Sequence, residues 1–328
     1  MRRAFWIAAA LVAVGVPLLH PNSYVLDVIA KAYITAIAVY GLNVILGYTG
    51  LLNLGHAAFF AIGAYGVALL EKNAGWPFWP ALLAGCLGSV VLGFFVGIIS
   101  LRTRGNYFAI FTAAIGVMIS IVLTNADKIT GGNVGIVAIP PPPNIGPVSF
   151  ADDIPKYYLV LAILVFAVAV CALVRNSLVG RTFVAIADNE DLARATGVDV
   201  PRTKLVAFML STFLAGLAGG VYAAYVGFLG PDQSGLDVTF QQLLFLVVGG
   251  IGTISGPLLG TLLLEGVSQW LQGVQQYRFI IFGPLLVVLV IFFPHGIAGG
   301  LARLQRRIAP RGPTPSARTA NAPEAAAS

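Results

Sequence analysis

Several polar side chains lie inside or directly before long apolar stretches of this sequence. Asn43, Asn53 and His56 cluster in and before the apolar stretch 51–70, and Gln241 lies near the start of another, at 238–254. A polar side chain is costly to place at membrane depth, and those found there commonly mark a pathway for ions or substrates. We therefore predict that these four residues line a candidate translocation path. For His56, a packed and hydrogen-bonded ring is an equally good interpretation.

Other residue patterns that support chemistry do not emerge from the sequence. His56 has no second histidine or carboxylate at helical spacing, which argues against a metal site. Cys86 and Cys171 lie in apolar stretches and form no CxxC pair.

The GxxxxGK[ST] phosphate-binding motif does not occur, and no Ser–His–Asp, paired-carboxylate or Cys–His arrangement is found on a soluble segment. We therefore expect no catalytic residues, no metal and no cofactor in this chain. Energy for uphill transport must then come from a partner or an ion gradient.

The elements that must position these residues are apolar helices. Of the 328 residues, 58% are hydrophobic and only 10% are charged, whereas soluble proteins carry about 25% charged residues. Since about 20 apolar residues span a bilayer core, we predict an all-α, polytopic transmembrane helical bundle with about ten spans, within a range of eight to ten. The third, eighth and ninth stretches are glycine-rich or short and can be broken or re-entrant. The apolar stretches are 4–19, 24–46, 51–70, 78–100, 107–124, 157–174, 205–227, 238–254, 257–271 and 279–293.

The distribution of Lys and Arg predicts the orientation of the bundle. Basic residues concentrate on the cytoplasmic side of membrane proteins, and ten spans with the N-terminus inside place most of the 19 Lys and Arg residues on that side. Both termini are then cytoplasmic, loop 125–156 is periplasmic and loop 176–203 is cytoplasmic. Residues 1–303 form the transmembrane domain, and residues 304–328 form a disordered cytoplasmic tail. The net charge of +6 does not predict a nucleic-acid partner, because the basic residues lie between apolar stretches.

The cytoplasmic loop contains the pattern of a short helix. We expect Asp188 to cap this helix and Glu190 and Asp191 to occupy its first turn, where acidic side chains suit the helix dipole. Gly197 can end the helix, and Ala193 contributes to a face of small residues. Such a compact helix suits docking into a groove of a cytosolic partner, although an ordinary polar loop is an equally good interpretation.

A set of motifs spread along the chain is specific in combination, although any one of them alone would be weak. They are GLN at 41–43, GYTGLLNLGHAAFFAIGAY at 47–65, RGNYFAI at 104–110, TGG at 130–132, GR at 180–181, NEDxAxxxG at 189–197 and GGIGTxxGP at 249–257. With these motifs the sequence resembles the LivM-type permeases of branched-chain amino-acid ABC importers, from about residue 33 to residue 300.

The resemblance implies a membrane permease subunit of an ATP-binding-cassette importer. Such a subunit forms part of the translocation path for branched-chain amino acids or similar small solutes, such as urea, amides or aromatic acids. The implied partners are a LivH-like second permease, two cytosolic ATPases that bind ATP and Mg, and a periplasmic solute-binding protein, all acting at the bacterial inner membrane. The positions that match the family's ATPase-coupling loop are Asp188, Asn189, Glu190, Asp191, Ala193 and Gly197.

An alternative function is a secondary transporter or channel for small polar solutes. The second to fifth apolar stretches and the last four form two four-span sets of opposite orientation, which is the arrangement of an inverted repeat. Secondary transporters commonly have this arrangement, so the alternative stays open at the level of the sequence.

Overall fold

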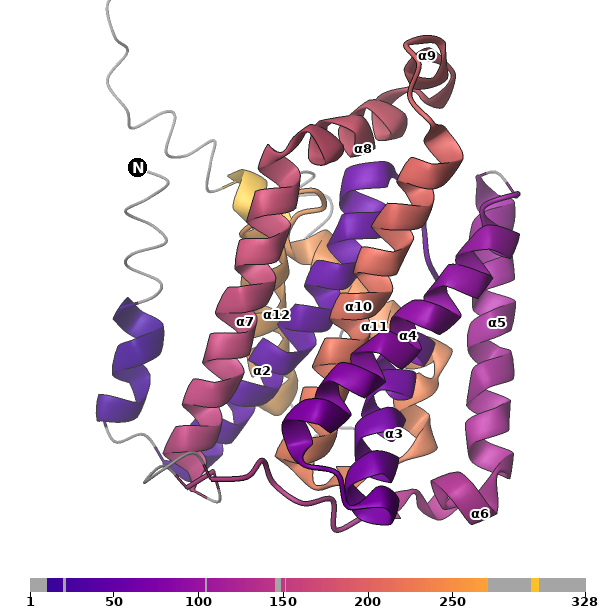
Figure 1. The fold of residues 1–328 in the computed structure, drawn as a ribbon. Helices are drawn as coiled ribbons and strands as arrows, with labels where there is room; N and C mark the ends of the chain where they lie inside the picture. The colour runs from indigo at the N-terminus through magenta and orange to yellow at the C-terminus, as the bar shows by residue number, and fades with distance from the viewer. Residues whose placement is uncertain are drawn as a thin grey trace, which may run out of the picture.

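The computed structural model describes residues 11–19, 22–103, 105–144, 149–150, 152–270 and 296–300. Within these residues, long helices stand side by side as a bundle (Figure 1). The expected span at 279–293, the tail at 304–328 and residues 4–10 of the first apolar stretch lie outside the described residues. The helices are α2 (Ser23–Leu42), α3 (His56–Ala74), α4 (Phe78–Ser100), α5 (Asn106–Asn125), α6 (Asp127–Thr130), α7 (Asp153–Asn176), α8 (Leu178–Asp188), α9 (Glu190–Ala195), α10 (Val200–Val226), α11 (Leu236–Gly249) and α12 (Gly256–Trp270).

Short elements join these helices. A π-helical turn, η2 (Asn43–Gly47), extends α2, and the 3-10 turns are η1 (Val16–Leu19), η3 (Gly132–Val134) and η4 (Pro231–Ser234). Two short strands, β1 (Ile136–Val137) and β2 (Phe228–Leu229), pair antiparallel. The described part of the chain is therefore predominantly helical, as the all-α prediction requires.

The helices α2 and α10 form the interior of the bundle. In their apolar windows, 78% of the α2–η2 residues and 67% of the α10 residues are buried. α10 packs against α2, α3 and α4. A Cβ atom on Gly63 of α3 would lie 2.2 Å from the carbonyl oxygen of Gly216 in α10, so only glycine fits at this crossing. Small residues allow helix backbones to approach closely in lipid, and the glycines of α10 serve this packing.

The helices α4, α5 and α7 lie at the outside of the bundle. Only 39%, 22% and 28% of the residues in their apolar windows are buried, and large apolar side chains such as Phe95, Met118 and Phe166 are exposed. Apolar surface of this extent needs lipid or another protein to cover it. Among the described residues, five helices are long and apolar enough to cross a membrane, namely α2–η2, α4, α5, α7 and α10. The total of about ten spans stays a prediction.

Two helix pairs are interrupted by irregular backbone. Residues 50–55 form no helix between η2 and α3, and residues 250–255 form none between α11 and α12. The helix α3 starts only at His56, so the first five residues of the expected stretch 51–70 are not helical. Irregular backbone at membrane depth persists only where protein or water satisfies its polar groups. These two breaks are therefore the places where buried side chains must contact backbone.

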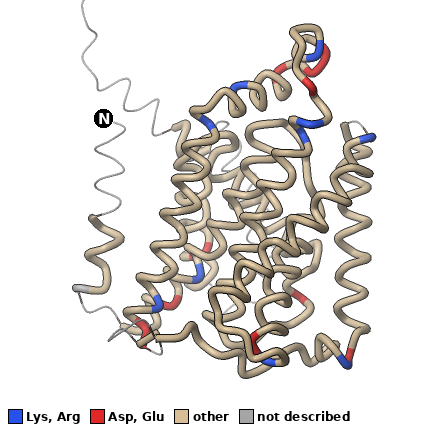
Figure 2. Tube along the Cα trace, viewed as in Figure 1, with Lys and Arg blue, Asp and Glu red and all other residues tan. Residues whose placement is uncertain are grey.

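The two long loops lie at opposite ends of the bundle. α8 and α9 stand at one end, and α6 lies at the other end (Figure 1). At the α6 end, Ile136 of β1 pairs with Leu229 of β2, which joins the loop before α7 to the loop after α10. Charged residues gather mainly towards these two ends (Figure 2). This arrangement agrees with two loops on opposite sides of a membrane.

Candidate functional sites

Asn43 joins the two interrupted helix pairs. Its side chain is fully buried, and its Oδ1 accepts a hydrogen bond from the amide of Gly252 at 2.8 Å. Its Nδ2 donates to the carbonyl oxygen of Thr253 at 2.9 Å. The hydroxyl of Tyr40, one turn earlier in α2, donates to the carbonyl oxygen of Ile254 at 2.7 Å. The predicted path residue Asn43 therefore binds the backbone of the 250–255 turn through both the oxygen and the nitrogen of its side-chain amide.

Arg175 contacts the same turn from the last turn of α7. Its Nη1 donates to the carbonyl oxygen of Gly252, and its guanidinium carbon lies 5.6 Å from the centroid of the Tyr48 ring. In the sequence, Arg175 is one of the basic residues whose distribution predicts the orientation of the bundle, and no further role was predicted for it. Its position at the end of an apolar stretch, directly before the loop 176–203, was the signal that could have indicated more.

Asn53 lies in the irregular segment before α3 and is fully buried. Its Oδ1 accepts from the amide of Gly55 at 3.0 Å, while its Nδ2 has no hydrogen-bond partner among the described residues. The segment is held from outside by Thr112 of α5, whose hydroxyl accepts from the Leu54 amide at 3.1 Å. Asn53 therefore offers one unused donor inside the bundle.

His56 is a packed, hydrogen-bonded histidine at the start of α3. Its ring is fully buried, and Nε2 donates to the carbonyl oxygen of Ala38 in α2 at 2.9 Å. That tautomer leaves Nδ1 as an acceptor for the hydroxyl of Ser211 in α10, at 3.5 Å. Both ring nitrogens are thus directed at neighbouring helices. Among the described residues, no group of three His, Cys, Asp or Glu side chains could hold a metal ion.

Gln242, rather than its neighbour Gln241, points into the protein from α11. Gln241 is half-buried, whereas Gln242 is only 3% exposed, and its Oε1 has no partner among the described residues. Thr239, three residues earlier on the same helix face, accepts a hydrogen bond from the amide of Ala57 at 3.1 Å. The face that carries Gln242 therefore meets the start of α3. Gln242 was not among the predicted path residues, because the sequence does not show which of two adjacent glutamines the helix turns inward.

The expected coupling loop forms two helices, α8 and α9. The cap of α9 is Asn189, not Asp188 as we expected, because the Asn189 Oδ1 accepts from the Leu192 amide at 3.0 Å while Asp188 ends α8. Glu190 and Asp191 do occupy the first turn of α9. Gly197 follows its end with φ of +90°, a conformation that favours glycine.

Ala193 faces inward, which corrects the expected docking face of small residues. It is 3% exposed and packs in a small cluster with Ile186 and Val200. The outward side of α9 carries Leu192 instead, which is 63% exposed. A large apolar side chain that stands beyond the bundle at this end is a better anchor for a partner than a buried alanine.

Glu190 ties α9 to the start of α10. Its Oε2 accepts from the Lys204 ammonium at 2.6 Å, and its Oε1 accepts from Arg194 at 3.1 Å. Lys204 is only 6% exposed, so this carboxylate compensates a nearly buried positive charge. The acidic residue that we expected at the partner surface thus also holds the loop in place.

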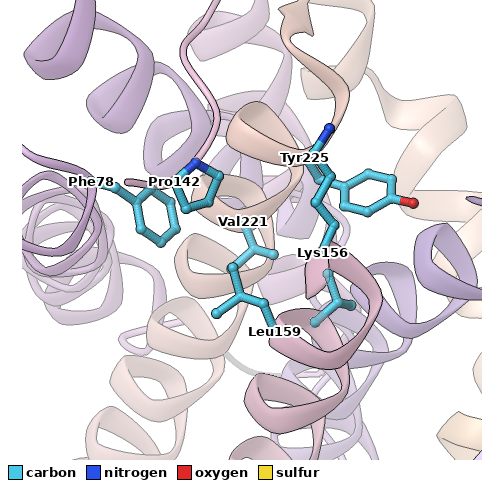
Figure 3. Close-up of a pocket in the computed structure, with 7 residues that line it drawn as sticks. Phe78, Pro142, Lys156, Leu159, Val221 and Tyr225 are labelled. Atoms are coloured by element: carbon cyan, nitrogen blue, oxygen red, sulfur yellow. The ribbon is translucent and has the colours of Figure 1, made fainter. Parts of the chain in front are cut away.

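A small apolar pocket lies where α4 and α7 begin and α10 ends (Figure 3). Its volume of about 10 Å³ has room for one water molecule at most, so it is a packing gap and not a solute site. It is lined by Phe78, Pro142, Lys156, Leu159, Val160, Val221 and Tyr225.

Comparison with known proteins identifies one family. The model of the branched-chain amino acid transport system permease component matches residues 24–292. The LivM permease protein of the high-affinity branched-chain amino acid transport system of Salmonella typhimurium is 32% identical over 319 residues, which covers 90% of this chain and 75% of LivM. LivM of Escherichia coli K12 has the same identity and coverage. The LivH permease protein of Salmonella typhimurium is 25% identical over 80% of this chain and 91% of LivH. No solved structure matches the chain significantly.

Proposed function

This chain belongs to the family of branched-chain amino acid transport permeases, and we propose that it carries branched-chain amino acids or similar small solutes across the bacterial inner membrane. It is a multi-pass helical membrane protein and a translocation subunit of a multi-component importer, not an enzyme. ATP hydrolysis belongs to separate ATPase subunits, so we place the binding of ATP and Mg in those partners.

The proposed topology has about ten spans with both termini in the cytoplasm. It is supported by the separation of α8 and α9 from α6 at opposite ends of the bundle. Arg175, Arg181, Arg194 and Arg202 lie in or next to the loop that we assign to the cytoplasm, as the distribution of basic residues in membrane proteins favours. The loop 125–156 is then periplasmic and available to a solute-binding protein.

The helix pair α8–α9 is the observation that carries the proposed function. It stands beyond the bundle at the end that we assign to the cytoplasm, and it is fixed to α10 through the Glu190–Lys204 ion pair. A rigid helix pair outside the membrane gives an ATPase a surface through which it can act on the bundle. We propose that the exposed Leu192, with Asp188 and Asp191 beside it, contacts the ATPases, while Asn189, Glu190, Ala193 and Gly197 maintain the helix pair.

The proposed path follows the interior face where α11 meets the segment before α3. The unused Asn53 amide donor and the unused Gln242 amide acceptor are the polar groups there that a passing solute can bind. An amino acid carries both a carboxylate and an ammonium group, which suits one donor and one acceptor. Asn43 and His56 support this region by holding its backbone, and Gln241 lies beside Gln242 at its edge.

Reconstitution of the chain with co-expressed ATPases, a LivH-like permease and a binding protein tests the function. We expect uptake of labelled leucine, isoleucine or valine into proteoliposomes that requires ATP at the ATPase side. A matched complex whose ATPases carry an inactivating substitution should bind solute without accumulating it.

The opposite result would favour the alternative function. Flux through the chain alone, independent of ATP and abolished by an ionophore, would show a secondary transporter. Flux that is insensitive to both treatments and follows the solute gradient would show a channel.

A further inference from the structure

Both interrupted helix pairs meet next to α8. The π-helical turn η2, which precedes the first break, touches the second break: a Cβ atom on Gly47 would lie 2.6 Å from the amide nitrogen of Gly252. A Cβ atom on Gly50, in the first break, would lie 3.6 Å from the Cβ of Ala187 in the last turn of α8. The helix that we assign to the ATPase surface therefore contacts the first break directly, and the turn η2 that leads into this break contacts the second.

Arg175 connects α8 to the second break. It lies in the last turn of α7, and Ser177 caps the start of α8 by accepting a hydrogen bond from the Gly180 amide at 3.2 Å. Only one residue thus separates the guanidinium from the cap of α8. Through this short link, the position of α8 is coupled to the carbonyl group of Gly252.

The 250–255 turn depends on side chains from other elements for its conformation. Gly250 and Gly252 both have positive φ, of +119° and +72°, and such residues lose much conformational entropy when they are ordered. Tyr40 and Asn43 hold the turn from α2 and η2, whereas Arg175 holds it from the α7–α8 corner. Arg175 therefore binds the turn to the α8 side of the protein.

We propose that Arg175 is a positioning residue that transmits the displacement of α8 to the Gly250–Ser255 turn, using the Tyr48 ring as its support. This inference rests on the proposed function, since α8 moves only if a partner acts on it. The planar guanidinium bonds the carbonyl group and faces the ring at the same time, which a lysine ammonium cannot do as well. Arg175 then couples ATP hydrolysis to the opening of the path.

The test compares Arg175→Ala with Arg102→Ala in the reconstituted full importer. Arg102 is an exposed arginine in the α4–α5 connection and serves as the matched control. We expect Arg175→Ala to assemble with its partners and to hydrolyse ATP, but to consume at least about fivefold more ATP per solute imported. Arg175→Lys should show a smaller rise in the same ratio. A purely structural role would lower the amount of complex and leave this ratio unchanged.

An unchanged ratio of ATP to solute in assembled Arg175→Ala would overturn the inference and leave the proposed function intact. Failure of the wild-type complex to use ATP would instead contradict the proposed function. If neither Arg175 variant assembles, Tyr48→Leu decides, because it removes the ring that supports the guanidinium. A raised ratio of ATP to solute in the assembled Tyr48→Leu complex supports the inference. A ratio equal to that of the wild type contradicts it.

Discussion

At the scale of single residues, the polar side chains inside the bundle divide into two groups. The hydrogen-bonding groups of Asn43 and His56 are engaged with backbone or side chains of neighbouring elements. Asn53 and Gln242 each keep one buried polar atom without a partner in the described part of the chain. An unsatisfied buried polar group costs free energy. A hydrogen bond from a solute or a water molecule therefore stabilises the protein most at Asn53 and Gln242.

The first prediction concerns Asn43. Asn43→Ala leaves the Gly252 amide and the Thr253 carbonyl group without this partner, and a loss of about 1–3 kcal/mol in the free energy of unfolding is expected. The measurement is thermal unfolding of the detergent-solubilised protein. Asn125→Ala is the control, since the exposed Asn125 side chain donates to the Ile121 carbonyl oxygen in its own helix. Equal stability of the two variants would contradict the bridging role of Asn43.

The second prediction concerns the Glu190–Lys204 pair. In a double-mutant cycle with Glu190→Gln and Lys204→Met, we expect a coupling energy of about 0.5–3 kcal/mol, because the single Glu190 change leaves a nearly buried ammonium group unpaired. The exposed Asp199–Arg202 pair is the control and should show a coupling energy below about 1 kcal/mol. Strictly additive effects of the two substitutions would show that the Glu190–Lys204 ion pair does not hold α9 to α10.

The third prediction separates Gln242 from Gln241. Gln242→Leu removes the unused acceptor at nearly constant volume, so solute uptake by the assembled importer should fall more than in Gln241→Leu, the matched control. ATPase activity and complex yield report whether either variant is misfolded. Equal uptake by both variants and by wild type would assign Gln242 to packing.

At the scale of elements, α8 and α9 differ from the long helices because they stand beyond one end of the bundle (Figure 1). The N-terminus of each helix is capped by a local side chain, Ser177 for α8 and Asn189 for α9. Capping lets short helices hold their shape where little packing surrounds them. The pair can therefore act as one rigid lever on α7 and α10, to which its two ends are joined.

The fourth prediction tests the surface of this helix pair. Burial of a leucine side chain contributes about 1.5–3 kcal/mol, so Leu192→Asp should weaken ATPase binding about tenfold or more. Co-purification with the ATPases at graded concentrations measures the change. Ile129→Asp is the matched control, because Ile129 is 62% exposed but lies in α6 at the opposite end. A similar loss of binding in both variants would contradict docking on α9.

At the scale of the whole molecule, a buried centre of α2 and α10 is surrounded by helices with large exposed apolar faces. Lipid and a second permease are the surroundings that such faces fit in the proposed importer. Most of the charged residues lie towards the two ends of the bundle (Figure 2). Each end therefore suits contact with the water on one side of the membrane.

The fifth prediction tests the orientation of these two ends. Single cysteines at Lys72 and Lys128 should react with a membrane-impermeant maleimide in intact spheroplasts, and single cysteines at Arg102 and Asp191 only after permeabilisation. Wild-type protein should stay unlabelled under both conditions, since Cys86 and Cys171 are buried. The reverse labelling order would invert the proposed topology, and labelling of all four sites in intact spheroplasts would contradict loops on opposite sides.

Some features of this protein follow from the sequence by itself. Apolar stretches separated by basic residues determine a helical membrane protein, since the bilayer imposes the length and the internal hydrogen bonding of each span. The motif set determines the family. The first turn and the end of α9 were also predictable, because Glu190, Asp191 and Gly197 act on backbone within a few residues of themselves.

Other features were decided only by the tertiary structure. Asn43 and Gly252 are 209 residues apart in the chain, so nothing local indicates that one satisfies the other. The rotation of α11 selects Gln242 over Gln241, and the packing of α9 on α10 turns Ala193 inward. The proposed role of Arg175 likewise depends on η2 and the 250–255 turn, which are far apart in the chain and meet beside the corner between α7 and α8. In each case the partner is a backbone or apolar surface brought close by packing, and a sequence pattern carries no record of that contact.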